Sequence, residues 1–303
     1  MDKASTRRSI LQFAGSAAAS FLFADKASPQ SSELVRESAY NYIIVAQDGS
    51  KVFFRRMENG AKVSAIDLNK PGYQIIPYAK YLFTPALINL TPASALSIGL
   101  GAGSFNRLFN LCYPDAKLAT VEIDRMILDL AVEFTHFTEN SNNTVIIDDG
   151  RRFLHRSHGQ WDWIIIDAFV KNSQYPQYMA THEFFELVSD HLTDNGVLAI
   201  NIILGNKLFS CLIATIKIVF PNCLLFDVPE SENAVVIASR NASPPLERQI
   251  KTASAPQISL MKDNGVDLLQ MRDAGVVPNA VGCSTPLTDD FSPTEFLGAE
   301  WRR

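Results

Sequence analysis

Short apolar runs alternate with amphipathic stretches from Ala95 to Ala238, and this alternation constrains the fold more than any other feature of the chain. Runs such as Ala95–Ile98 and Trp161–Ile166 have the length and composition of buried strands, and segments with helical periodicity follow them. Strands that alternate with helices form a mostly parallel sheet covered on both faces. The expected fold class is therefore α/β, with a ligand bound at the carboxyl ends of the strands.

The segment that precedes this alternation has a different β pattern. Asn41–Val45 and Lys51–Arg55 are apolar runs separated by turn residues, which is typical of an antiparallel hairpin. We predict a small N-terminal antiparallel β subdomain with a following helix over about Ile76–Ile88, together residues 33–85, and an α/β domain over residues 86–297. The polar stretch Pro29–Glu37 is interpreted as a short linker.

Residues 1–27 have the features of an export signal. The paired arginines Arg7 and Arg8 precede a weakly apolar run rich in Ala, Gly and Ser from Leu11 to Ala24, a pattern typical of the twin-arginine pathway. The run is too short for a permanent transmembrane helix. We expect an exported protein, periplasmic or membrane-anchored. The alternative is an amphipathic N-terminal helix on a cytoplasmic protein.

Charge and composition narrow the partners of the chain. The formal net charge is −5 and no Lys/Arg run stands out, so a nucleic-acid partner is not expected. Membrane contact is expected only through an uncleaved N-terminal signal. The five histidines show no ligand spacing, and no metal is predicted. The four cysteines form no CxxC pair and are expected to be buried apolar residues, with a Cys211–Cys223 disulfide as the alternative.

A glycine turn and an acidic residue on the next strand predict a nucleoside site. Gly99, Gly101 and Gly103 lie between a strand and a helix, where glycine lets the backbone approach a ligand closely. About 20 residues further, Glu122 ends the second strand, and its carboxylate can accept hydrogen bonds from both ribose hydroxyls. Asp124 is placed to cap the helix that follows.

The next two strand ends also carry acidic residues. Asp149, followed by Gly150, is placed to accept the exocyclic amine of adenine, and the alternative is a helix cap. Asp167 follows an apolar run, so its carboxylate would lie at the mouth of the cleft above the sheet, and the alternative is a cap of the loop after the strand. The absence of a GxxxxGK[ST] motif argues against a nucleoside triphosphate, whereas spacing alone leaves NAD and S-adenosylmethionine open.

The order of these motifs resembles the spermidine synthase (polyamine aminopropyltransferase) superfamily, in its spermidine synthase-like branch. The resemblance covers about residues 38–297. The segments that carry it are Ser38–Asn41, Ala95–Gly101, Val121–Asp124, Asp148–Leu154, Trp161–Phe169, Thr181–Phe185, Asn195–Leu198 and Leu287–Glu295.

The resemblance implies the Rossmann-like fold of S-adenosylmethionine-dependent methyltransferases. It also implies transfer of an aminopropyl group from decarboxylated S-adenosylmethionine to a small-molecule amine in polyamine biosynthesis, with release of methylthioadenosine. By the same resemblance Asp167 is the catalytic base, Tyr78 is a substrate residue on the gating helix, and Asn41 binds the cofactor. A homodimer is one oligomeric state that the family leaves open.

Several positions depart from the family pattern. Ala102 stands where the usual synthases have an aspartate in the glycine turn, Val170 stands where a second aspartate holds the far amine of putrescine and is followed by Lys171, and Lys80 stands where the gating helix carries an acid. A cleft that lacks carboxylates is a poor match for a doubly charged diamine. We therefore expect that putrescine is not the best substrate and that intact S-adenosylmethionine also binds.

Two other functions stay open beside aminopropyl transfer. One is an S-adenosylmethionine-dependent methyltransferase, which would release S-adenosylhomocysteine. The other is a nucleoside-binding relative without catalysis. The Asp289–Asp290 pair is interpreted as a cap at a helix or turn beside the site.

Overall fold

The computed structural model describes residues 33–56, 60–168, 176–204, 209–240, 255–278 and 285–291, and the structural statements below concern these residues. They all belong to one compact unit, Ser31–Arg303. The predicted export signal, residues 1–27, lies outside the described residues, and so do Val170 and Lys171.

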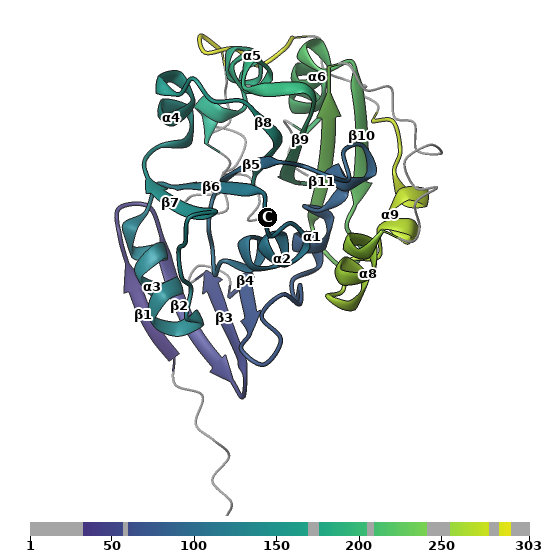
Figure 1. Cartoon of the computed structure of the whole chain (residues 1–303). Coiled ribbons are helices and arrows are strands. Elements are labelled where there is room, and N and C mark those ends of the chain that lie inside the picture. The colour runs from purple at the N-terminus through teal and green to yellow at the C-terminus, as the bar shows by residue number, and fades with distance from the viewer. Residues whose placement is uncertain are drawn as a thin grey trace, which may run out of the picture. The chain divides into compact units, whose positions relative to one another are not determined.

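A seven-stranded sheet forms the centre of this unit (Figure 1). Its order is β10-β11-β9-β8-β5-β6-β7, in which β5 to β9 run parallel and β10 and β11 are antiparallel. The strands are β5 (Ser94–Ile98), β6 (Lys117–Glu122), β7 (Asn143–Ile147), β8 (Trp161–Ile166), β9 (Leu192–Ile203), β10 (Asn222–Asp227) and β11 (Asn233–Ser239). The α/β fold class is confirmed, and β7 and β8 have the predicted bounds.

The central strands are apolar because helices cover both of their faces. On β8, Trp163 and Ile165 belong to one buried cluster, while Ile164 and Ile166 belong to a second cluster on the opposite face. The helices around the sheet are α2 (Ser104–Cys112), α3 (Arg125–Thr135), α4 (Gly150–Arg156), α5 (His182–Asp190), α6 (Phe209–Val219), α8 (Pro256–Asp263) and α9 (Leu268–Ala274).

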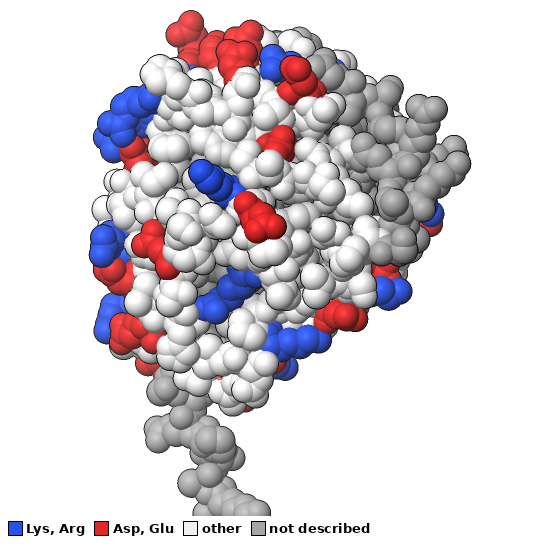
Figure 2. Space-filling model, in the orientation of Figure 1, with Lys and Arg blue, Asp and Glu red and all other residues white. Residues whose placement is uncertain are grey.

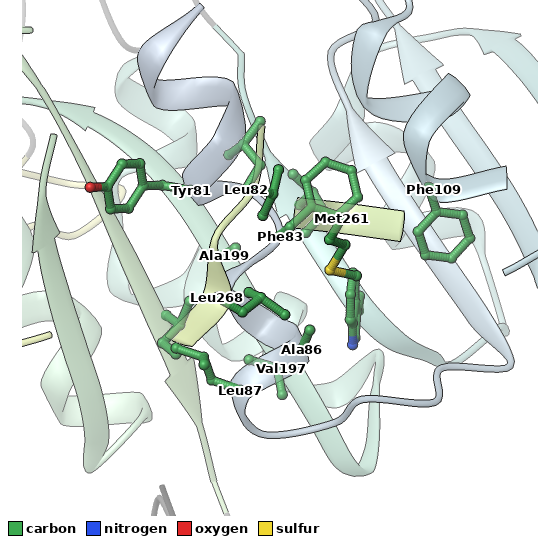
Figure 3. Close-up of a cluster of buried hydrophobic side chains, with 14 of the residues drawn as sticks. Tyr81, Leu82, Phe83, Ala86, Leu87, Phe109, Val197, Ala199, Met261 and Leu268 are labelled. Atoms are coloured by element: carbon green, nitrogen blue, oxygen red, sulfur yellow. The ribbon is translucent and has the colours of Figure 1, made fainter. Parts of the chain in front are cut away.

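Figure 3 shows part of the first cluster, where Met261 of α8 and Leu268 of α9 lie among side chains of β9, α2 and the segment from Tyr81 to Leu87. Met261 is fully buried and Leu268 is nearly so. The two helices were not predicted from the sequence. Their apolar residues are buried by contact with distant parts of the chain. The spacing of apolar residues within each segment therefore does not indicate a helix.

A four-stranded antiparallel sheet precedes the larger one, which confirms the predicted small antiparallel N-terminal subdomain and adds strands on both sides of its hairpin. Its strands are β1 (Glu33–Glu37), β2 (Tyr42–Asp48), β3 (Lys51–Arg56) and β4 (Lys62–Asp67), and it packs against α3 and the glycine turn. The linker interpretation is wrong for Glu33–Glu37, which pairs with β2. This edge strand is mostly exposed and therefore lacks an apolar pattern. Both sheets lie in the same unit, so the boundaries 33–85 and 86–297 remain predictions.

The continuous helix expected over Ile76–Ile88 is wrong. The structure has a short helix, α1 (Pro77–Tyr81), and then a separate 3-10 turn, η1 (Thr84–Leu87). Pro85 lacks the N–H that a continued α-helix would use, so it starts a new turn instead.

Cys112 and Cys223 are buried free thiols, in agreement with the prediction of buried apolar cysteines. Burial raises the pKa of each thiol to about 12. The alternative Cys211–Cys223 pairing is wrong, since Cys211 is disulfide-bonded while Cys223 is free. Cys211 lies near the start of α6 and Cys223 lies past its end, so at a rise of about 1.5 Å per residue they are too far apart to be bridged.

The surface carries charges of both signs. On the face shown in Figure 2, acidic and basic side chains are interspersed. Within the described part of the chain, no helix has the length and apolar character needed to cross a membrane.

Candidate active site

A cavity of about 210 Å³ lies where the carboxyl ends of the parallel strands face the N-terminal sheet. It is lined by eight of the nine residues that the sequence predicted for the site: Asn41, Tyr78, Gly99, Gly101, Glu122, Asp149, Gly150 and Asp167. Gly103, the ninth, does not line it. Residues that follow four neighbouring strands are therefore brought to one crevice.

The glycine turn needs glycine because it passes close to two other elements. Gly99 has a φ of +105° and Gly101 a φ of +55°, a region that side chains with a Cβ rarely adopt. A Cβ on Gly99 would collide with the carbonyl oxygen of Asp167, and one on Gly101 would lie 2.7 Å from Oγ of Ser64. Gly103 instead faces an aromatic ring outside the cavity, so packing requires it.

Glu122 ties this turn to the end of β6. Its Oε2 accepts a hydrogen bond from the N–H of Leu100 at 3.0 Å, and its Oε1 accepts one from the N–H of Asp124 at 2.9 Å. The side chain lines the cavity although the residue is only 7% exposed. Burial raises the pKa of Glu122 to about 7, against the opposing effect of these hydrogen bonds. A carboxylate in this place can accept hydrogen bonds from two vicinal hydroxyls.

Asp124 caps α3, as the sequence predicted, because its Oδ1 accepts a hydrogen bond from the N–H of Met126 at 3.0 Å. Its Oδ2 accepts from Oγ of Ser38 at 2.6 Å and from Nδ2 of Asn41 at 2.8 Å. Asn41 thus lines the cavity, and it links the N-terminal sheet to the segment after β6 that contains Asp124.

Asp149 is the cap of α4, which was the alternative considered for it, and the residue also lines the cavity, while its contact with adenine stays a prediction. Its Oδ1 accepts from the N–H of Arg152 at 2.8 Å, which caps α4, and its Oδ2 accepts from the hydroxyl of Tyr178 at 2.7 Å. Tyr178 also lines the cavity and was not identified from the sequence. Its segment is held by Arg151, which donates to the carbonyl of Tyr178 at 2.7 Å.

Asp167 lies directly after β8 and is partly buried. Burial raises the pKa of Asp167, while a hydrogen bond from Asn201, the hydroxyl of Tyr78 and the charge of Arg56 act to lower it. The bond from Nδ2 of Asn201 to Oδ1 of Asp167 is 2.8 Å long. The Tyr78 hydroxyl donates to the carbonyl of Val63 at 2.6 Å.

Asn201 is itself oriented by a further amide. Nδ2 of Asn233 donates to Oδ1 of Asn201 at 2.9 Å, so the amide nitrogen of Asn201 faces Asp167. Sequence reasoning missed both asparagines. Asn201 could have been noticed because it is a polar residue inside the apolar run Val197–Ile202. Its exposed fraction in the structure is 1%.

Two of the positions that depart from the family pattern, Ala102 and Lys80, lie in the described part of the chain and do not line the cavity. Ala102 is buried, and its N–H donates to Oγ of Ser64 at 2.9 Å. Lys80 lies in the last turn of α1 and does not line the cavity.

Asp289 forms a two-bond ion pair with Arg151, at 2.7 and 2.6 Å, so its carboxylate holds α4 rather than capping a helix. The part of the chain that the structure describes holds no group of three or more His, Cys, Asp or Glu side chains placed to bind a metal.

Residues 79–242, more than half of the chain, match the family model of the spermine/spermidine synthase domain. A probable polyamine aminopropyl transferase from Bifidobacterium longum is 31% identical over 277 residues, which cover 86% of this chain and 61% of that protein. The chain thus spans less than two thirds of this relative. The polyamine aminopropyltransferase of Vibrio vulnificus is 28% identical over 251 residues, 79% of this chain and 82% of the relative.

A third relative is named as a methyltransferase rather than as an aminopropyltransferase. The N-terminal histidine N-methyltransferase of Emericella nidulans is 32% identical over 168 residues, 51% of this chain and 29% of that protein.

Solved structures agree on the fold. A probable spermidine synthase from Corynebacterium glutamicum superposes with a TM-score of 0.60 at 19% identity, covering 86% of this chain and all of that one. A spermidine synthase in complex with the transition-state analogue AdoDATO gives 0.57 at 18% identity, covering 78% of this chain and 88% of that chain.

The pKa of Glu122 predicts that nucleoside binding depends on pH. Because only the ionised carboxylate accepts from both ribose hydroxyls, and the carboxyl has a pKa of about 7, the Kd of methylthioadenosine should fall roughly tenfold from pH 6 to pH 8. Glu122→Gln should bind weakly at both pH values. Glu133→Gln, an exposed change on α3, should behave like the wild type. Isothermal titration calorimetry measures this, and a wild-type Kd that stays constant would contradict the role of Glu122.

Proposed function

The chain belongs to the spermine/spermidine synthase family, and we propose that it transfers an aminopropyl group from decarboxylated S-adenosylmethionine to an amine. The observation that carries the proposal is the position of Asp167. Its carboxylate follows β8 in the same cavity that Glu122 and Asp149 line. A proton acceptor therefore lies beside the place where a nucleoside would bind.

The donor would lie across the tips of β5, β6 and β7. Glu122 would accept hydrogen bonds from the ribose hydroxyls and Asp149 one from the adenine amine, while the glycine turn lets the backbone approach the ligand closely. The sulfonium and its aminopropyl group would then extend from Gly99 towards Asp167, whose carbonyl oxygen lies against Gly99.

The reaction needs an acceptor nitrogen that has lost a proton. Asp167 takes that proton and the nitrogen lone pair attacks the aminopropyl carbon bonded to sulfur. The C–N bond forms as the C–S bond breaks, and the C–S electron pair neutralises the sulfonium to give methylthioadenosine. Burial raises the pKa of Asp167, which makes it a better proton acceptor than an exposed aspartate. The bond from Asn201 fixes the direction of the carboxylate.

A methyltransferase is the second candidate. The similarity to the histidine N-methyltransferase of Emericella nidulans favours it, because the nucleoside end of the cavity would serve intact S-adenosylmethionine equally well. Mass spectrometry of the products separates the two, since methyl transfer leaves S-adenosylhomocysteine and aminopropyl transfer leaves methylthioadenosine. A nucleoside-binding relative without catalysis would give neither.

We also propose that the protein is exported through the twin-arginine pathway. Arg7 and Arg8 with the weakly apolar run after them support this, and so does the disulfide at Cys211, because disulfides persist in oxidising compartments. Replacing both arginines with lysine should leave the protein in the cytoplasm of the expressing cell, as read by fractionation. A variant that still reaches the periplasm would contradict the proposal.

Asp167→Asn should separate catalysis from binding. The amide keeps the shape of the carboxylate but cannot accept the proton, so kcat should fall by about 10²–10⁴ while the Kd of methylthioadenosine stays within a few-fold. Release of methylthioadenosine, followed by chromatography, measures the rate. Asp115→Asn, at an exposed position, is the matched control. Full activity in Asp167→Asn would refute the proposed role.

Asn201→Ala should change the pH profile. The hydrogen bond from Asn201 lowers the pKa of Asp167, so its loss raises that pKa further and the base stays protonated to a higher pH. The acidic limb of kcat/KM should therefore move to higher pH. Asn222→Ala, at a residue whose amide donates to the carbonyl of Arg240, should keep the wild-type profile. A merely structural role for Asn201 would lower the rate without moving the limb.

A further inference from the structure

A series of side-chain hydrogen bonds leads from the turn before β11 to the proposed base. Oγ of Ser231 donates to Oδ1 of Asn233 at 2.8 Å, and Nδ2 of Asn233 donates to Oδ1 of Asn201 at 2.9 Å. Nδ2 of Asn201 in turn donates to Oδ1 of Asp167 at 2.8 Å. We call Ser231, Asn233 and Asn201 the relay. It connects a turn of the chain to one oxygen of the Asp167 carboxylate.

The pairing of three strands places these side chains in line. Asp167 and Asn201 both follow a pair of opposed isoleucines in the parallel register of β8 and β9. In the antiparallel register of β9 and β11, Asn201 lies opposite Val235, which is two residues after Asn233. Residues two apart on a strand point to the same face, so the two asparagine side chains are diagonal neighbours on one face of the sheet.

The donors of the relay all point towards Asp167. An ionised carboxylate can only accept hydrogen bonds, so the atom of Asn201 that faces it has to be the amide nitrogen. The oxygen of Asn201 then faces the nitrogen of Asn233, and the oxygen of Asn233 faces the Ser231 hydroxyl. Hydrogen bonds aligned in one direction polarise one another, which strengthens the last bond of the series.

Burial makes the bond from Asn233 matter for Asn201. Asn201 is almost fully buried, whereas Asn233 and Ser231 are half-buried. A buried amide oxygen that loses its donor is unfavourable, because water does not replace the lost partner. Asn233 therefore determines which way the amide of Asn201 points.

We infer that Asn233 is a positioning residue for the proposed base, which it affects through Asn201, and that the Ser231 hydroxyl holds Asn233 in the required orientation. The relay keeps an amide nitrogen against Oδ1 of Asp167 and so favours the ionised carboxylate. The inference rests on the proposed function for the role of Asp167 as a base. The hydrogen bonds of the relay are independent of it.

Other groups also act on the Asp167 carboxyl. Burial raises its pKa, and beside Asn201 the Tyr78 hydroxyl on α1 and the charge of Arg56 on β3 lower it. The other charged or titratable side chains of the described residues that line the cavity are Lys62, Glu122, Asp149, Tyr178 and Glu232. The variants below remove none of these groups.

Asn233→Ala tests the relay through the pH dependence of turnover. Loss of the donor weakens the bond from Asn201, so Asp167 keeps its proton to a higher pH. The acidic limb of kcat/KM for the acceptor should therefore move to higher pH. On that limb kcat/KM should fall about two- to tenfold, and at alkaline pH it should stay close to the wild-type value. The donor is kept saturating, because ionisation of Glu122 affects nucleoside binding in the same pH range.

Asn233→Asp is a second variant, with nearly the same shape as the wild type. A carboxylate at this position would draw the amide nitrogen of Asn201 away from Asp167 and would add a like charge. The acidic limb should therefore move further than in Asn233→Ala.

A double variant separates the relay from a merely structural contact. Asn233→Ala should change nothing further in a protein that already carries Asn201→Ala, because its effect passes through Asn201. Asn222→Ala on β10 is the matched control and should keep the wild-type limb. The inference is overturned if Asn233→Ala leaves the limb in place, lowers kcat/KM equally at every pH, or moves the limb equally with and without Asn201.

The titration of Asp167 can also be followed without turnover. The carbon NMR signal of its carboxyl, identified by its loss in Asp167→Asn, should titrate at a higher pH in Asn233→Ala than in the wild type. A protein that shows this change yet releases no methylthioadenosine would refute aminopropyl transfer and support the relay. A protein that releases methylthioadenosine while Asp167 titrates identically in both would refute the relay alone.

Discussion

The paired hydrogen bonds that the Glu122 carboxylate accepts hold the site together. One comes from the glycine turn after β5 and the other from the backbone at the start of α3, so a single side chain fixes the distance between two strand ends. Asp124, held by this bond, caps α3 and binds Ser38 and Asn41 of the N-terminal sheet. The carboxylate is nearly buried, and burial raises its pKa because these contacts offset the unfavourable desolvation only in part.

A second constraint places the proposed base. Gly99 and the carbonyl of Asp167 approach so closely that no Cβ fits between them. This contact brings the ends of β5 and β8 together and sets the Asp167 carboxylate above the glycine turn. The side chain is then held from the far side by Asn201 and Asn233, which lie on β9 and β11. Four strands of the large sheet therefore determine the direction of one carboxylate.

The sequence predicted those parts of the molecule that local chemistry determines. Strand β8 is buried on both faces from Trp163 to Ile166, and β7 ends in the apolar run Val145–Ile147, so both strands could be found from their composition and the acidic residues that follow them could be placed at the strand ends. Edge strand β1, helices α8 and α9, and the residues Asn201, Arg56 and Tyr178 were missed. Each of these acquires its role only through contact with a distant segment. Arg56, for instance, lines the cavity only because the N-terminal sheet packs on α3 and the glycine turn.

The charge of Arg56 offsets part of the effect of burial on Asp167. Burial alone would favour the protonated form of Asp167, and a protonated carboxyl cannot act as a base. The nearby guanidinium opposes this by stabilising the ionised form. The N-terminal sheet, which carries Arg56 on β3, therefore bears on the protonation state of the proposed base as well as forming part of the cavity wall.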